Sequence, residues 1–502
     1  MKARTAAAVG LLAMVAALLA VIAPSLPVAV LVGLAAVGIC LCSPWAGLLL
    51  VVLTTFLVPV PFSYHVGGTT LTAGRLVFFA ALAGWVIQSR RHPRPTFRSP
   101  NPLDLPLLLW LAITVVAAVV NITALTNYEV SGAIRRVLTD GLDYLLPFWL
   151  TVGLLGRRPD RIRSLLEWMA GLGGFTGVLA VVEFFTHRNI FTFLHPVLPA
   201  ATNQYIDQLT ASGTLVRSGI FRVHSTFEQP LIFGTVEALM LPIGLALAIN
   251  ARDRRARLGW SVTGLVMMAG MLFTASRATY LLLLLSLVMT AALNWRRAGW
   301  QIVFMLVGVT ALAVIQPNVR TQLVSSFHNR PGTELHNSLE HRLHDIGPTL
   351  AAVGRRPVVG YGPRTFESDE LALSNRLPPP ANTILDDAYL GQLGEGGLLG
   401  LLSLILILVV AATGAGRSRT RAVDPGQRAL RAALLIAVVN WALMSAVADV
   451  YTFNAPPRLF FILLGVIATW RIQDGWPDES PVWLRPAADD LRVTAAATAP
   501  TA

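Results

Sequence analysis

The sequence predicts an all-α, polytopic transmembrane helix bundle with about 12–14 spans and one large extracytoplasmic loop. Three observations lead to this prediction. Of the 502 residues, 54% are hydrophobic and only 13% are charged, and the mean hydropathy is +0.62. Soluble domains carry about 25% charged residues, so a water-soluble chain of this length could not cover so much apolar surface. The composition therefore excludes a soluble enzyme and a disordered chain.

Each predicted span is a mostly apolar stretch close to the length of about 20 residues that crosses a bilayer as a helix. We expect spans at 6–23, 26–42, 44–60, 71–88, 103–123, 141–156, 164–186, 230–249, 260–276, 278–294, 300–316, 387–413, 432–450 and 459–470. The first span follows Lys2 and Arg4, as in a signal peptide, but it runs directly into the next apolar stretch. We therefore expect it to be retained as a helix.

Arginine runs between alternate spans set the predicted orientation. The runs are Arg90, Arg91, Arg94 and Arg98; Arg157, Arg158, Arg161 and Arg163; Arg252, Arg254, Arg255 and Arg257; Arg296 and Arg297; and Arg417, Arg419, Arg421, Arg428 and Arg431. Because positively charged loops stay on the cytoplasmic side, this pattern places both termini in the cytoplasm. The net charge of +12 lies mainly in these runs, which indicates a lipid bilayer and no nucleic acid as partner.

The chain divides into a membrane bundle at 1–470 and a cytoplasmic tail at 471–502, whose Pro, Ala and Thr content predicts disorder. The face opposite the arginine runs carries two long loops, at 187–229 and 317–386. Long loops between spans are uncommon unless they have a function. Within the larger loop, residues 336–354 can form an amphipathic helix that lies on the membrane surface. We expect the functional residues on this face.

Three arginines run against the positive-inside pattern, because Arg222, Arg277 and Arg342 fall on the outer side. A charged side chain at membrane depth is costly unless it has a partner. One suitable partner is an anionic head group, whose phosphate oxygens the guanidinium fork binds with two hydrogen bonds. The alternative is an internal ion pair with a structural role only, for example between Arg277 and Glu237.

Two adjacent carboxylates, Asp386 and Asp387, end the large loop and begin the next span. Aspartate is a favoured residue at the start of a helix, where it caps the free backbone N–H groups. A carboxylate beside several arginines can equally act as general base for an attacking hydroxyl. The residues alone leave both interpretations open.

A metal site is not predicted. Four residues of the large loop could in principle converge on a metal, but their spacing matches no zinc motif. They are His336, His341, His344 and Asp345. The chain also lacks a phosphate-binding loop and a dinucleotide fingerprint, so nucleotide hydrolysis has no support.

Four stretches resemble motifs of the O-antigen ligase and O-antigen polymerase superfamily of bacterial membrane glycosyltransferases. They are FRVHSTFEQPLIFG (221–234), TASRA (274–278), HRLHDIGPTLAAVGRRPVVGYGPRTF (341–366) and DDAYLGQLGEGGLLG (386–400). The last is similar to the ligase signature of His-Asn, nine residues, Gly, two residues and Gly. Asp386 falls on the signature His, Asp387 on its Asn, and Gly397 and Gly400 on its glycines. The order of the motifs around one large loop makes the resemblance specific.

The resemblance implies transfer of a glycan from a polyprenyl-diphosphate donor to an acceptor hydroxyl on the extracytoplasmic face of a bacterial cell membrane. Arg222, Arg277 and Arg342 would hold the donor diphosphate, and Asp386 would deprotonate the acceptor, which is a glycan or a lipid. Fixed arginines can stabilise a diphosphate leaving group without a metal, so we expect no metal, no cofactor and an inverting transfer. The sequence departs from the family at Asp386, where ligases carry His.

Two other classes of protein stay open. A transporter, such as a flippase of lipid-linked glycan or a carrier of small anions, would use ionisable residues inside the spans. Such residues are Glu167, Glu183, Glu237 and Asp449. A transporter would not explain the ordered motifs, and the chain shows no repeated half. A scaffold of a wall-assembly complex that has lost its catalytic His is the third class. Polymerase and ligase differ in their acceptor, which the sequence does not reveal.

Overall fold

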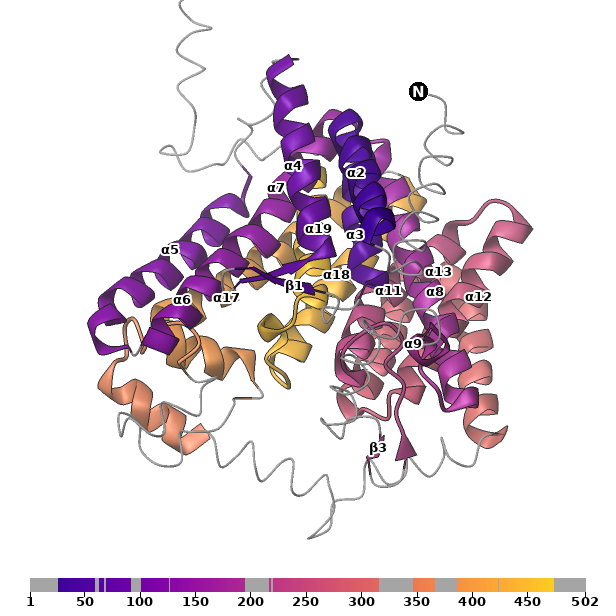
Figure 1. Cartoon of the computed structure of the whole chain (residues 1–502). Helices are drawn as coiled ribbons and strands as arrows, with labels where there is room; N and C mark the ends of the chain where they lie inside the picture. The colour runs from indigo at the N-terminus through magenta and orange to yellow at the C-terminus, as the bar shows by residue number, and fades with distance from the viewer. Residues whose placement is uncertain are drawn as a thin grey trace, which may run out of the picture.

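The fold is seen in a computed structural model of the whole chain (Figure 1). The structure describes residues 26–58, 63–66, 69–91, 101–125, 127–194, 216–217, 220–315, 346–365, 385, 387–422 and 424–473. The predicted first span at 6–23, most of the loop at 317–386 and the tail beyond 473 lie outside these residues. All statements below concern the described part of the chain.

The molecule is a bundle of helices with two short hairpins. Its helices are α2 (Leu26–Cys42), α3 (Pro44–Leu57), α4 (Ala73–Arg91), α5 (Asp104–Asn121), α6 (Asn127–Thr139), α7 (Leu146–Arg157), α8 (Arg161–Thr186), α9 (Ile190–Leu194), α11 (Pro230–Asn250), α12 (Arg254–Phe273), α13 (Arg277–Ile315), α17 (Ala388–Arg421), α18 (Pro425–Ser445) and α19 (Ala455–Gln473). A further helical segment covers 346–355. A π-helical turn, η2 (Asp140–Leu145), joins α6 to α7, and short 3-10 turns lie at Ile122–Ala124 and Val450–Thr452.

The hairpins are antiparallel and lie in connecting segments. In the first, β1 (Ser63–Val66) pairs with β2 (Thr69–Thr72), so that Ser63 lies opposite Thr72. In the second, β3 (Val216–Arg217) pairs with β4 (Ile220–Phe221). Neither hairpin forms part of a larger sheet, so the predicted all-α membrane bundle is confirmed.

Seven of the described helices are long and apolar enough to cross a membrane. They are Asp104–Asn121, Arg161–Thr186, Pro230–Asn250, Arg254–Phe273, Arg277–Asn294, Ala388–Arg421 and Pro425–Ser445. Two of the other predicted spans, at 26–42 and 44–60, are shorter apolar helices here. The predicted spans at 278–294 and 300–316 both fall within α13, which breaks at Asn294, where φ is −129°.

Local sequence explains where several helices begin. Pro lies in the first turn of α3, α11 and α18. Backbone N–H groups in the first turn have no hydrogen-bond partner within the helix, so a residue without an N–H is tolerated there. Ser43 caps α3 through its hydroxyl, which accepts a hydrogen bond from the Ala46 N–H. Asp424 caps α18, because its carboxylate accepts a hydrogen bond from the Gln427 N–H. These starts follow the sequence preferences of helix N-termini.

Helix α11 forms the centre of the bundle, since 94% of the residues in its 18-residue apolar stretch are buried. It packs against α8, α12, α13 and α18. On one side of the bundle α5 lies along α17, and on the other α8 lies along α12 (Figure 1). Aromatic pairs join neighbouring helices: Trp441 stacks on Phe460 with ring centroids 4.5 Å apart, and Phe184 stacks on Phe273 at 3.7 Å.

Two of the arginine-rich turns and the break in α13 lie at one end of the bundle, which we call the basic end. The α11–α12 turn meets the α17–α18 turn there, because a Cβ on Gly426 would lie 3.8 Å from the Asn250 Cβ. The guanidinium of Arg419 donates a hydrogen bond to the Leu293 carbonyl, 2.9 Å away. Short connections then return α12 and α18 to the opposite end, which we call the site end. It contains the segment 221–229, the α12–α13 turn and the start of α17.

Candidate functional site

The segment 221–229 runs across the site end, from the α12–α13 turn to the end of α3. At its first residues, the Arg222 Nε–H donates a hydrogen bond to the Thr274 carbonyl over 2.9 Å. The Val223 N–H donates to the Phe273 carbonyl over 3.1 Å. Arg222 is only 8% exposed, and the hydrogen bond to Thr274 holds its side chain at Nε. Arg277 follows three residues after Thr274 and starts α13, where it is partly buried.

A buried polar cluster holds the middle of this segment. Ser225 has a left-handed backbone, with φ of 56°, and its N–H donates to the Glu183 carboxylate on α8 over 2.7 Å. The other Glu183 oxygen lies 3.3 Å from the His224 Nε2. The opposite ring nitrogen of His224 hydrogen-bonds the Phe227 carbonyl over 2.7 Å. The Asn189 amide donates to the Ser225 carbonyl over 2.7 Å. These bonds position the loop that carries Arg222.

Protonation of His224 opposes folding. Burial lowers the pKa of His224 from 6.5 to about 4, because the imidazolium is poorly solvated there, and the Arg222 charge adds to this effect. Between pH 6.5 and 4 the unfolded chain therefore binds more protons at this residue than the folded one, and the contribution of His224 to the free energy of unfolding falls as the pH falls. The full effect is about 3 kcal/mol at 1.36 kcal/mol per pKa unit.

We expect His224 to make the pH dependence of thermal stability less favourable at low pH, so the unfolding temperature of His224→Gln, relative to that of the wild type, should rise between pH 7 and pH 5. The measurement is the unfolding temperature in detergent at each pH. His187→Asn is the matched control, since His187 is exposed at the end of α8, and its pH dependence should equal that of the wild type. Equal slopes for His224→Gln and the wild type would contradict a buried, neutral His224.

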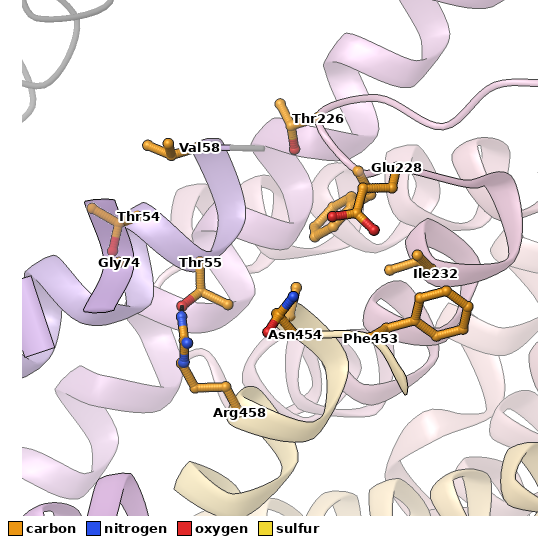
Figure 2. A pocket seen from close by; sticks show the side chains of 12 residues that line it. Thr54, Thr55, Val58, Gly74, Thr226, Glu228, Ile232, Phe453, Asn454 and Arg458 are labelled. Carbon is orange, nitrogen blue, oxygen red and sulfur yellow. Dashed lines mark hydrogen bonds between the residues drawn. The ribbon is translucent and has the colours of Figure 1, made fainter. Parts of the chain in front are cut away.

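The end of the segment borders a cavity. The Thr226 hydroxyl donates a hydrogen bond to the Phe56 carbonyl at the end of α3. Beyond this contact, α3, the start of α4, residues 226–232 and the start of α19 surround about 500 Å³ of space, part of it open to solvent. Figure 2 shows Glu228, Asn454 and Arg458 around this space, together with Thr55.

A chain of charges supports the cavity wall. Asp143, on the η2 turn, accepts hydrogen bonds from the Arg458 Nη2 over 2.7 Å and from the Arg75 Nε over 2.9 Å. Arg458 is 4% exposed and Asp143 is 1% exposed, so both charges are buried and paired. A π-helical turn inserts an extra residue per turn, and such turns occur often at functional sites. Here η2 aims Asp143 toward α4 and α19.

Burial of Glu228 changes its ionisation. The pKa of its carboxyl is raised from 4.5 to about 7, because burial against the cavity wall leaves the carboxylate poorly solvated by water. No hydrogen bond or ion pair holds this carboxyl within the described residues. A carboxyl that titrates near neutral pH can bind a hydroxyl or exchange a proton with it.

The glycine motifs of the resemblance fold against one another. Helix α17 breaks at Gly397, where φ is +64°, and a Cβ there would collide with the Val358 carbonyl. Just after this break, the Leu398 N–H donates a hydrogen bond to the Pro357 carbonyl over 2.7 Å. Gly362 also has positive φ, and its N–H donates to the Glu395 carbonyl over 2.9 Å. The segment 357–364 is thereby fixed to the first turns of α17.

Asp387 acts as the N-cap of α17. Its carboxylate accepts hydrogen bonds from the Tyr389 N–H over 2.8 Å and from the Leu390 N–H over 3.3 Å. The Tyr389 hydroxyl donates to the Ala442 carbonyl over 2.8 Å, which ties this helix start to α18. The capping interpretation is therefore confirmed for Asp387, whereas Asp386 lies outside the described residues.

Two of the four predicted site residues lie at the α12–α13 turn. Arg222 hydrogen-bonds the Thr274 carbonyl of this turn, and Arg277 begins α13. Arg342, like Asp386, lies outside the described residues. The alternative ion pair between Arg277 and Glu237 is absent, since the Glu237 carboxylate accepts its hydrogen bond from the Thr176 hydroxyl over 2.8 Å.

Sequence reasoning missed the residues of the cavity. Glu228 is two residues before the proline that starts α11, and Arg458 follows two prolines at the start of α19. A charge near a helix-starting proline at the end of an apolar stretch is the signal that could have identified both.

Comparison with known families supports the resemblance seen in the sequence. Residues 262–405 match a family model described as O-antigen ligase. The match runs from α12 to α17 and includes Arg277, the glycine segment 357–364 and the Asp387 cap. A comparison with curated proteins finds no match. Over these residues the chain is similar to the O-antigen ligase family, which implies a membrane glycosyltransferase-like ligase.

Proposed function

We propose that this protein is a glycan polymerase or ligase, which transfers a glycan from a polyprenyl-diphosphate donor to an acceptor hydroxyl. The observation that carries this proposal is the contact between Arg222 and the Thr274 carbonyl. This contact supports the proposal because Arg222 then lies beside the turn that precedes Arg277, and residues 262–405 match the O-antigen ligase family. Guanidinium groups bind phosphate oxygens through paired hydrogen bonds, so this turn suits a diphosphate.

In the proposed reaction, Arg222, Arg277 and Arg342 bind the donor diphosphate. The acceptor oxygen attacks the anomeric carbon while the bond from this carbon to the phosphate oxygen breaks. Asp386 takes the proton of the acceptor hydroxyl, and the lipid diphosphate leaves with the electron pair of the broken bond. Fixed positive charges stabilise the leaving group as its charge develops. Attack opposite the leaving group inverts the anomeric configuration.

The proposed setting is a bacterial cell membrane, with the basic end in the cytoplasm and the site end on the extracytoplasmic face. The grouping of arginine-rich turns at one end supports this orientation through the positive-inside rule. Both termini are then cytoplasmic, and the loop 317–386 is extracytoplasmic. The bundle comprises 1–470, and 471–502 forms the cytoplasmic tail.

Thiol labelling tests the orientation. Cysteines placed at Ser326 and Ser374 should react with a membrane-impermeant maleimide in intact cells, because both positions lie in the loop 317–386. A cysteine at Ser418, at the basic end, is the matched control and should react only after lysis. Protection of both loop cysteines until lysis would reverse the proposed orientation.

Deletion of the gene tests the function in cells. A polymerase deletion should shorten the surface glycan, whereas a ligase deletion should leave lipid-linked chains of normal length to accumulate. The measurement is the size distribution of surface and lipid-linked glycan. Unchanged glycan in both fractions would contradict glycan transfer.

A further inference from the structure

The cavity at the site end contains polar groups that lack partners. The Glu228 carboxyl and the Asn454 amide both line it, and neither makes a hydrogen bond to any described residue. The buried Nε of Arg458, on the same wall, also lacks a hydrogen-bond partner. Glu228 and Asn454 are partly exposed, whereas Arg458 is 4% exposed. Polar atoms in proteins are normally hydrogen-bonded, so these three groups around one space can bind the complementary groups of a polar ligand. Figure 2 shows the Glu228 carboxylate and the Asn454 amide directed into the space between them.

The rest of the lining is apolar apart from Thr54, Thr55 and Thr226. Phe227, Ile232 and Phe453 lie on the wall beside the polar groups. Pockets of this kind combine apolar faces with a few convergent polar groups that fix the orientation of a ligand. A sugar ring suits this combination, because it has hydroxyl groups around its edge and C–H groups on its faces. A carboxylate accepts two hydrogen bonds from hydroxyls, and an amide both donates and accepts.

The charges around the cavity argue against a second diphosphate site. Arg458 is already paired with Asp143, which also binds Arg75 on α4. Glu228 adds a carboxylate, which would repel a phosphate whenever it is ionised. The balance of charges therefore favours a neutral, hydroxyl-rich ligand over an anion.

The cavity is close to the arginine turn. Arg222 and Glu228 are six positions apart on one segment, so their Cα atoms are separated by at most about 20 Å. A ligand in the cavity is thus within the length of a short oligosaccharide from a donor held at the α12–α13 turn.

We propose that this cavity binds the terminal sugar of the acceptor glycan, with Glu228 and Asn454 accepting and donating hydrogen bonds to its hydroxyl groups. This assignment rests on the proposed glycan transfer and names the acceptor class as a sugar. Glu228 positions the acceptor in this account, while proton transfer stays with Asp386.

Alkylation tests binding without turnover. Val58 lines the cavity, and Val58→Cys in a Cys42→Ala background places a thiol at its wall, since Cys40 is fully buried. The probe is the oligosaccharide mixture released by mild acid from the surface glycan of wild-type cells. It should slow maleimide alkylation of the purified, full-length protein. Adding Glu228→Gln should abolish the protection, whereas Glu167→Gln, at the basic end, should keep it.

Steady-state transfer gives the second readout. A hydrogen bond to a charged group contributes enough binding free energy that its loss raises the KM for the oligosaccharide roughly tenfold or more. We expect this rise in Glu228→Gln and in Asn454→Ala, with kcat changed little. Both variants should keep the wild-type unfolding temperature, because neither side chain has a protein partner to lose.

The pH dependence separates binding by Glu228 from a purely steric effect. The carboxylate form exists above the pKa of about 7, so the KM should rise as the pH falls below 7. The charged groups near Glu228 are Arg458 on α19, its partner Asp143 and Arg75 on α4. The rise should be absent in Glu228→Gln.

The outcomes distinguish this assignment from the proposed function. Protection by the oligosaccharide without release of lipid diphosphate would contradict glycan transfer and keep the cavity as a sugar site. Transfer at normal rates without protection, or with an unchanged KM in Glu228→Gln, would overturn the cavity assignment.

Discussion

Asp386→Asn is expected to lower glycan transfer by about 10²–10⁴-fold, the usual contribution of general-base catalysis. The amide keeps the shape of the side chain but cannot accept the proton of the acceptor hydroxyl. Asp386→His restores the residue of the family signature and should retain partial activity. The measurement is transfer from a lipid-diphosphate donor by purified variants with wild-type unfolding temperatures.

Asp387 provides the control, because its carboxylate caps α17 through the Tyr389 and Leu390 N–H groups. Asn caps nearly as well as Asp, so Asp387→Asn should keep both activity and stability. Asp387→Ala should lower the free energy of unfolding by about 1 kcal/mol. Normal transfer by Asp386→Asn would remove Asp386 as the base and direct the search to His341, His344 and Asp345.

Arg277→Lys should lower transfer by about 10²–10³-fold, as does loss of a charged or hydrogen-bonding group that stabilises a transition state. Lysine keeps the positive charge but loses the fork that binds two phosphate oxygens. If Arg277 only formed a structural ion pair with Glu237, lysine would replace it and transfer would be kept. The Glu237 carboxylate instead accepts a hydrogen bond from the Thr176 hydroxyl. Transfer rates and unfolding temperatures of the same preparation separate the two effects.

Arg255→Lys is the matched control for this variant, since Arg255 is exposed at the basic end. It should transfer glycan at the wild-type rate. If Arg277→Lys also did so, Arg277 would have no part in donor binding, and the diphosphate would have to be held by other groups.

The membrane helices could be predicted from the sequence because apolar length alone defines them. The predicted span at 103–123 is α5 (Asp104–Asn121), and the one at 230–249 is α11 (Pro230–Asn250). The break of α13 at Asn294 coincides with the boundary between two predicted spans. The arginine runs predicted the same end for the α11–α12 and α17–α18 turns, which the structure places side by side, since positive charge does not enter the bilayer readily.

The cavity could not be predicted, because its parts are distant in the chain. Asp143 pairs with Arg75 and Arg458, which are 68 and 315 positions away. The π-helical turn that aims Asp143 inward has the composition of an ordinary helix start. The contact between Arg222 and Thr274 likewise joins residues that are distant in the chain. Only the family resemblance predicted that Arg222 and Arg277 act together, and this stays a prediction.

The central claim is that this protein transfers a glycan and releases a lipid diphosphate. The most direct measurement incubates the purified, full-length protein, in detergent with EDTA, with lipid-linked glycan extracted from cells that lack the gene and with the acid-released oligosaccharides as acceptor. We predict release of polyprenyl diphosphate together with an acceptor of higher mass, and no release by Asp386→Asn. Intact donor in this assay, with movement of the same lipid-linked glycan across vesicles that contain the protein, would contradict the account and identify a transporter.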